Sequence, residues 1–208
     1  MPKREKSGLG NVNGFFLAKT TQALFTALFA TLVFHSSSAR AQSAGAHLTP
    51  AGSVRAPDGA ANLCTRYGWA CRGGGDTRLN SAEILSLARD INLRVNRRVR
   101  AVDDQAQYRR AEHWALPTRR GGDCEDFALL KKKELLAKGV SADRLLIATV
   151  FIRGLGAHAV LVLRLDTGDM ILDNVTNVIK PWQETPYTFM RMQNPERPDG
   201  WVLVSARR

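Results

Sequence analysis

The sequence is poor in the two residue types that most often carry thiol-based hydrolytic chemistry. Its 208 residues include three cysteines and four histidines. Three cysteines cannot all pair within one chain, so at least one thiol is left over. Two of the histidines fall early, at His35 and His47, which leaves His113 and His158 as candidate bases. Any catalytic thiol site must therefore be built from very few side chains.

The chain also lacks an apolar run long enough to span a bilayer. Its longest apolar run, residues 23–34, is well short of the roughly 20 residues that a transmembrane helix needs, which argues against an uncleaved membrane anchor. Basic residues precede this run, and Ala39-Arg40-Ala41 follows it, as at a signal-peptide cleavage site. We interpret residues 1–41 as a secretory signal and expect a periplasmic or secreted bacterial protein.

Acidic residues are in the minority. The formal net charge is +11, and residues 42–208 keep 25 basic against 18 acidic side chains, or +7. A basic chain can bind nucleic acid, but here the bases are scattered, with neither interleaved aromatic residues nor a recognisable nucleic-acid motif. We expect a solvated basic surface and no nucleic-acid partner.

Length and composition predict one folded domain after the signal. The hydrophobic fraction is 44%, enough for one core in a chain of this size. Residues 42–61 are rich in Ala, Gly, Ser and Pro without apolar periodicity, so they are expected to form a flexible lead. The domain is then expected to occupy residues 62–208, and no internal repeat is evident.

Two helices are predicted from their start signals and periodicity. Asn80-Ser81-Ala82-Glu83 is a capping-box pattern, and apolar residues follow at helical spacing, which predicts a helix over 81–100. A second helix is expected from Asp123, as N-cap, to about residue 138, ahead of a glycine. Its core side is expected to hold Phe127, Leu130 and Leu135, and its solvated side the lysines at 131–133.

The C-terminal half has the composition of strands. Runs of β-branched and apolar residues predict strands at 145–152, 158–165 and 170–175, and a last one at 201–204. A turn signal at 166–169 predicts that the second and third form an antiparallel hairpin. We therefore expect an α+β domain in which the helix after Asp123 packs on an antiparallel sheet.

The three cysteines leave two pairings open. Cys64 and Cys71 lie close in sequence, and in an exported protein they would form a short-loop disulfide that leaves Cys124 free. Alternatively, one of them pairs with Cys124 and silences it. We expect the first arrangement.

A free Cys124 would lie in the first turn of a helix, where the helix dipole favours a thiolate. His158 is the expected base and Asp173 the residue that orients it. With Thr167 and Gly168 as the hairpin loop, however, His158 and Asp173 share a face but lie four residues out of step, roughly 13 Å along a strand. A loop, a bulge or strand coiling must close this gap if the triad exists.

The residues that flank Cys124 oppose its ionisation. Asp123, Glu125 and Asp126 place negative charge beside the thiol, which raises a thiol pKa. A divalent cation bound by these acids would offset that effect, and Ca²⁺ prefers carboxylate oxygens. The alternative is that the acids only stabilise the helix N-terminus.

Four segments together resemble a known family, the bacterial transglutaminase-like cysteine proteinases of the LapG periplasmic type. They are Glu112-His113-Trp114-Ala115-Leu116-Pro117, Gly121-Gly122-Asp123-Cys124-Glu125-Asp126-Phe127-Ala128, His158-Ala159-Val160-Leu161-Val162 and Leu172-Asp173-Asn174. The resemblance extends from the Cys64 region to about Trp201.

This resemblance implies a papain-like fold of the transglutaminase-core type, with Cys124 as nucleophile, His158 as base and Asp173 as orienting residue. It also implies calcium at Asp123 and Glu125. The expected partners are a protein substrate, a surface adhesin in related proteins, and an inner-membrane receptor that restrains the protease. The expected activity is peptide hydrolysis. The alternatives are acyl transfer to an amine and a catalytically silent, calcium-stabilised binding module.

Overall fold

The computed structural model describes residues 47–205, and the secretory signal expected at 1–41 lies outside them. Within the described range no helix combines the length and the apolar character that crossing a membrane requires.

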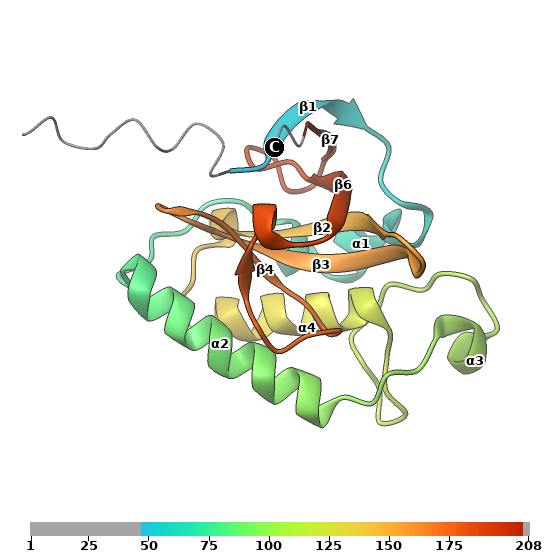
Figure 1. The fold of residues 1–208 in the computed structure, drawn as a ribbon. Coiled ribbons are helices and arrows are strands. Elements are labelled where there is room, and N and C mark those ends of the chain that lie inside the picture. The colour runs from blue at the N-terminus through green and yellow to red at the C-terminus, as the bar shows by residue number, and fades with distance from the viewer. Residues whose placement is uncertain (1–46, 206–208) are drawn as a thin grey trace, which may run out of the picture. The chain divides into compact units, whose positions relative to one another are not determined.

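Seven antiparallel strands form one sheet in the order β1-β7-β6-β2-β3-β4-β5. They are β1 Thr49–Val54, β2 Leu145–Ile152, β3 Gly156–Leu165, β4 Gly168–Leu172, β5 Lys180–Pro181, β6 Tyr187–Gln193 and β7 Trp201–Ser205. The long helices α2 (Ser81–Arg98) and α4 (Cys124–Ala137) lie on the same side of this sheet (Figure 1). This arrangement confirms the predicted α+β class.

Short helical turns complete the domain. They are α1 Leu63–Arg66, α3 Asp104–Tyr108 and the 3-10 turns η1 Asp58–Ala60, η2 Gly68–Cys71, η3 Ala142–Arg144 and η4 Trp182–Glu184. Cys64 in α1 and Cys71 in η2 form the expected disulfide, and Cys124 is free.

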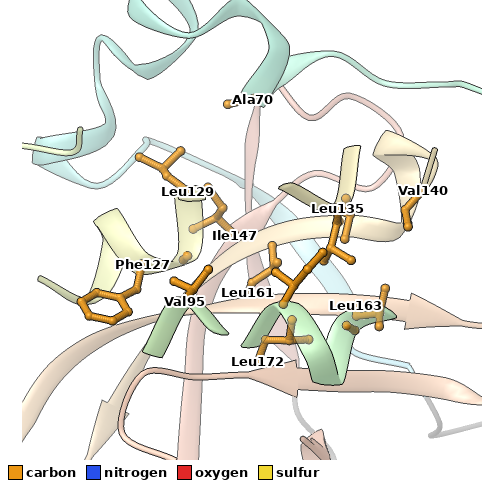
Figure 2. Packing of buried hydrophobic residues seen from close by; sticks show 14 of the residues in the cluster. Ala70, Val95, Phe127, Leu129, Leu135, Val140, Ile147, Leu161, Leu163 and Leu172 are labelled. Atoms are coloured by element: carbon orange, nitrogen blue, oxygen red, sulfur yellow. The ribbon is translucent and has the colours of Figure 1, made fainter. Parts of the chain in front are cut away.

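The core has one apolar cluster on each face of the sheet. On the helical side, Val95 of α2 and Leu135 of α4 pack against Ile147 and Leu161 of the central strands (Figure 2). On the other side, Leu146 and Val162 belong to a second cluster. Consecutive residues of the central strands therefore point to different clusters, as the twofold periodicity of a strand requires.

Helix α2 begins as predicted from the sequence. The Asn80 side chain accepts hydrogen bonds from the amides of Ala82 and Glu83, and Glu83 accepts one from the Asn80 amide. This reciprocal cap satisfies amides that have no partner inside the helix. Helix α4 also begins where expected, at Cys124, and stops before Gly139, whose φ of +87° suits glycine.

The expectation of a solvated lysine face on α4 is wrong. Lys131 and Lys132 are 1% and 0% exposed, and only Lys133 of the three is exposed. The Lys132 ammonium donates to Gln193 Oε1 at 2.7 Å, and the Lys131 ammonium lies 5.7 Å from the Phe127 ring centroid. Because α4 packs against both the sheet and α2, more of its circumference is buried than a surface helix would bury.

The expected flexible lead at 42–61 contains ordered structure that the sequence did not indicate. Residues 49–54 form the edge strand β1, which pairs with β7. Just before it, His47 and the Leu48 amide bond the buried carboxylate of Asp169, each at 2.8 Å. The proline and glycine in this segment are typical of loops, so its composition does not indicate a strand. The strand forms because the segment pairs with β7, which is distant in sequence.

The β3–β4 hairpin forms, but its predicted register is wrong. Leu165 pairs with Gly168, so the loop consists of Asp166 and Thr167 rather than of Thr167 and Gly168. Every cross-strand partner is displaced by two residues relative to the prediction. Turn composition alone does not specify which two residues make the loop.

Candidate active site

The nucleophile candidate Cys124 is held at the start of α4 by a tight turn of two glycines. Gly121 adopts a φ of +127°, and a side chain there would collide with the Arg100 carbonyl. A side chain at Gly122 would collide with the Asp126 carboxylate. Both positions therefore require glycine. The chain passes from this turn directly into the first turn of α4, where the Cys124 thiol is half-buried.

His158 of β3 and Asp173, just beyond β4, are brought into direct contact. The His158 Nε2 and Asp173 Oδ1 atoms are 2.8 Å apart. The corrected register would place His158 opposite Val175, two residues from Asp173 instead of four. The remaining offset disappears because Asp173 follows the last residue of β4 and is free of the ladder.

Asp173 is buried and receives several hydrogen bonds. The Val175 amide donates to Oδ1 at 3.0 Å, and the Tyr187 hydroxyl donates to Oδ2. Burial opposes ionisation of this carboxyl group, but the bonds from His158, Tyr187 and Val175 outweigh it and lower the pKa of Asp173. The carboxylate is therefore held charged and fixed in orientation beside the imidazole.

The thiol of Cys124 is turned toward its neighbour in sequence. Its sulfur donates to Glu125 Oε2 at 3.3 Å, and within residues 47–205 no hydrogen bond joins it to His158. Burial, and then the charge of Glu125, raise the pKa of Cys124, while the backbone amide of Ala159 lowers it. As the sequence indicated, the flanking acids work against thiolate formation.

Cys124 and His158 nevertheless line one pocket of about 420 Å³. Its walls also include Trp114, Thr149 of β2 and Arg191 of β6. His113, the rival base, lines no part of this pocket. Its ring packs against that of Tyr108 in a tilted arrangement, with ring centroids 4.5 Å apart. The pocket provides a cleft in which a peptide could meet both the thiol and the imidazole.

Beside the thiol is a cluster of three acids, Asp104, Asp123 and Glu125, whose ligand atoms lie within 4.8 Å of one another. Asp123 does not cap α4 with its side chain. Its Oδ2 accepts from the Asp104 amide at 3.2 Å instead. One carboxylate oxygen of each of the three acids is buried without a hydrogen-bond partner. Such oxygens are expensive to bury without a hydrogen bond or a bound cation, and three of them converge here.

Asp104 was missed by the sequence analysis. It precedes Cys124 by twenty residues, in a short helix without periodicity, and no spacing rule connects it to Asp123. The tertiary link is the pairing of Ala101 with Gly122, with a hydrogen bond from the Val102 amide to the Gly122 carbonyl. This contact places the start of α3 against the start of α4.

Comparisons with known proteins agree with this geometry. The family model for the bacterial transglutaminase-like cysteine proteinases (BTLCP) matches residues 51–208. No curated protein sequence matches the chain.

Among solved structures, the calcium-bound LapG of Legionella pneumophila is similar, with 26% identity and a TM-score of 0.50 over 60% of this chain and 71% of that one. Two further structures of L. pneumophila LapG, one of them EGTA-treated, match with 25% and 26% identity and TM-scores of 0.49. Both cover 60% of this chain and 69% of the other. The α+β papain-like core predicted from the sequence is thus confirmed. The chain belongs to the bacterial transglutaminase-like cysteine proteinases and is a cysteine peptidase.

Proposed function

We propose that this chain is an exported, calcium-dependent peptidase that cleaves a protein substrate through Cys124, His158 and Asp173. The observation that carries the proposal is the 2.8 Å contact between His158 and the buried Asp173, at a pocket that Cys124 also lines. Neither residue is close to Cys124 in sequence, and a histidine held by a buried carboxylate is the arrangement that a thiol nucleophile requires.

In this mechanism each residue has a defined task. Because Asp173 engages Nε2 of His158, Nδ1 is the nitrogen that accepts the thiol proton. The thiolate attacks the peptide carbonyl, and amides at the start of α4 stabilise the oxyanion. His158 then returns the proton to the leaving amine, and the same nitrogen activates the water that hydrolyses the thioester.

Calcium is proposed at the cluster formed by Asp104, Asp123 and Glu125. The three partnerless carboxylate oxygens fit a hard cation, and the similar L. pneumophila LapG is known in a calcium-bound form. A bound calcium ion would neutralise acids whose charge raises the pKa of Cys124. Glu125 would bind the ion through Oε1, whereas the thiol donates to Oε2, so the ion would withdraw negative charge from the group that holds the thiol.

The decisive experiment is digestion of a mixture of exported proteins by the purified chain and by Cys124→Ala, each with calcium and with EGTA. New N-termini, identified by mass spectrometry, should appear only with the unmodified chain in calcium. Equal products from both proteins would refute peptidase activity through Cys124. Equal activity in EGTA would refute calcium dependence alone.

Residues 1–41 are proposed to direct export and to be removed afterwards. A disulfide between Cys64 and Cys71 suits an oxidising compartment. N-terminal sequencing of the protein from a periplasmic fraction should begin at Gln42. Recovery of the uncleaved chain from the cytoplasm would contradict export. The family resemblance makes a surface adhesin the first substrate to test.

A further inference from the structure

We propose that Arg191 of β6 is a specificity-determining residue that binds a carboxylate of the substrate about three residues from the scissile bond. The inference rests on the proposed peptidase function and adds the chemical class of substrate that the cleft prefers. Four features of the structure lead to it: a bulge, a row of cross-strand neighbours, an unpaired guanidinium and the distribution of acids in the cleft.

A β-bulge turns two consecutive side chains of β6 into the cleft. Met192 pairs with Ala148 and Arg191 with Thr149, but the next partner of β2, Val150, pairs with Phe189. Met190 is therefore an extra residue. Neighbours in a regular strand point to opposite faces, yet Met190 and Arg191 both line the pocket that contains Cys124. Bulges near active sites commonly redirect a side chain in this way.

Arg191 lies on a line of residues that runs straight to the nucleophile. It pairs with Thr149 of β2, and Thr149 pairs with Ala159 of β3. Ala159 lines the pocket together with Cys124 and His158. Two strand spacings, about 10 Å, thus separate the backbone of Arg191 from the position beside the thiol. An extended peptide covers that distance in about three residues.

The Arg191 guanidinium is oriented but lacks an anionic partner. The side chain is half-buried, and its NH1 donates to the Arg55 carbonyl at 3.2 Å. Within residues 47–205 no carboxylate forms a salt bridge with it. A partly buried cation without a counter-charge is costly, whereas a carboxylate can satisfy a guanidinium through two parallel hydrogen bonds.

The acids that share the cleft are engaged elsewhere. Asp58 lies 3.8 Å from the Arg55 guanidinium, Glu112 accepts from the Trp114 indole at 3.1 Å, and Glu125 accepts from Cys124. None of them bonds Arg191. The free N–H groups of Arg191 are therefore available to a ligand, with the exposed Met190 side chain beside them to contact its apolar part.

The carboxylate could belong to an acidic side chain or to the C-terminus of the substrate. Pairs of synthetic peptides distinguish these sources. In the first set, the two peptides of each pair have Glu or Gln at one position, and this position is moved in turn through the three residues on each side of the cleavage site. All of these peptides have an amidated C-terminus. A further pair has a free or an amidated C-terminus and no acidic side chain. Cleavage sites come from the mass-spectrometric digestion described above.

The test variants are Arg191→Gln, which removes the charge, and Arg191→Glu, which reverses it. The control is Arg89→Gln, which also removes one positive charge but lies at an exposed position of α2. The unmodified chain and Arg89→Gln should prefer one carboxylate peptide over its neutral partner by about tenfold in kcat/KM. Arg191→Gln should abolish the preference, and Arg191→Glu should invert it, so that the neutral peptide is cleaved faster than its carboxylate partner. A purely structural role of Arg191 would slow all peptides equally and could not invert a preference.

A second measurement does not depend on turnover. Iodoacetyl dipeptide amides alkylate a thiol with loss of iodide, and the rate at Cys124 can be compared for Glu and Gln forms. The same Arg191-dependent preference is expected. Equal rates for all carboxylate and neutral probes, or a preference that survives in Arg191→Gln, would overturn the proposal. Cleavage without such a preference refutes this inference alone, whereas failure to cleave any peptide refutes the peptidase function.

Discussion

The thiol of Cys124 donates its hydrogen bond to the carboxylate of the adjacent residue, Glu125, and not to His158, the proposed base. The two roles proposed for this helix start, nucleophile and cation ligand, are therefore physically coupled. The carboxylate that would bind a cation is the same group that holds the thiol and raises its pKa. The reactivity of Cys124 should therefore depend on whether the Glu125 carboxylate binds a cation.

Replacement of Glu125 by Gln should make Cys124 more reactive in the absence of calcium. The substitution removes the carboxyl group whose charge, after burial, does most to raise the pKa of Cys124. Because burial and the charge of Asp123 raise the pKa of Glu125 itself to about 10, the rates are compared above pH 10. When the pKa of a thiol lies above the pH, each unit by which that pKa falls raises the thiolate fraction tenfold. A fall of about one unit should therefore accelerate alkylation by iodoacetamide in EGTA about tenfold. Glu134→Gln on the same helix is the control and should leave the rate unchanged. An unaltered rate in Glu125→Gln would show that Glu125 does not restrain the thiol.

Asp104→Asn should weaken calcium binding although Asp104 is remote from Cys124 in sequence. Loss of one of three clustered carboxylates removes charge and an oxygen from the site. Loss of a residue that only hydrogen-bonds to a metal ligand typically lowers metal affinity by about tenfold or more. Loss of a direct ligand should cost more than tenfold, as measured by titration calorimetry. The adjacent Asp103→Asn is the matched control, because Asp103 is exposed and outside the cluster. Equal affinities of the two variants would exclude Asp104 as a ligand.

Asp173→Asn should leave the fold intact and remove most of the activity. The amide has the shape of the carboxylate but cannot stabilise the imidazolium of His158, so kcat should fall by about 1,000- to 10,000-fold, as in other triads. Tyr187→Phe, which removes one donor to Asp173, should cost less, about tenfold. If Asp173→Asn kept more than a tenth of the activity, Asp173 would not be the orienting residue.

Lys132→Met should change the pH dependence of stability. Burial lowers the pKa of Lys132 to about 7, whereas in the unfolded chain it returns to about 10.4. Between these values the unfolded state binds the proton more strongly, so Lys132 destabilises the fold most at pH 7 and below, and the penalty is lost as pH rises toward 10.

The methionine variant should therefore gain stability over the unmodified chain at pH 7, and the gain should shrink by about 1.4 kcal/mol per pH unit up to pH 10. Denaturant unfolding at several pH values measures the difference. Lys133→Met, at an exposed position of the same helix, should show no such trend. A gain independent of pH would mean that Lys132 is not charged differently in the two states.

Local signals predicted the elements that depend on near neighbours. The capping box at Asn80 and the glycine pair before Cys124 specify helix starts through contacts within a few residues, and both helices begin where expected. Strand β2 also has its predicted bounds, because its continuous β-branched and apolar run suits a strand covered on both faces.

The sequence by itself determined the chemistry available to this protein: one free thiol on a helix start, one well-placed histidine, an aspartate after a strand, and acids around the thiol. Tertiary structure alone decided how these groups meet. The hairpin register brings His158 to Asp173, the Ala101–Gly122 contact brings Asp104 to Glu125, and the bulge at Met190 places that side chain beside Arg191 in the cleft. Each of these is a contact between distant residues, fixed by how the sheet and helices pack together, so no periodicity or spacing along the chain could have revealed it.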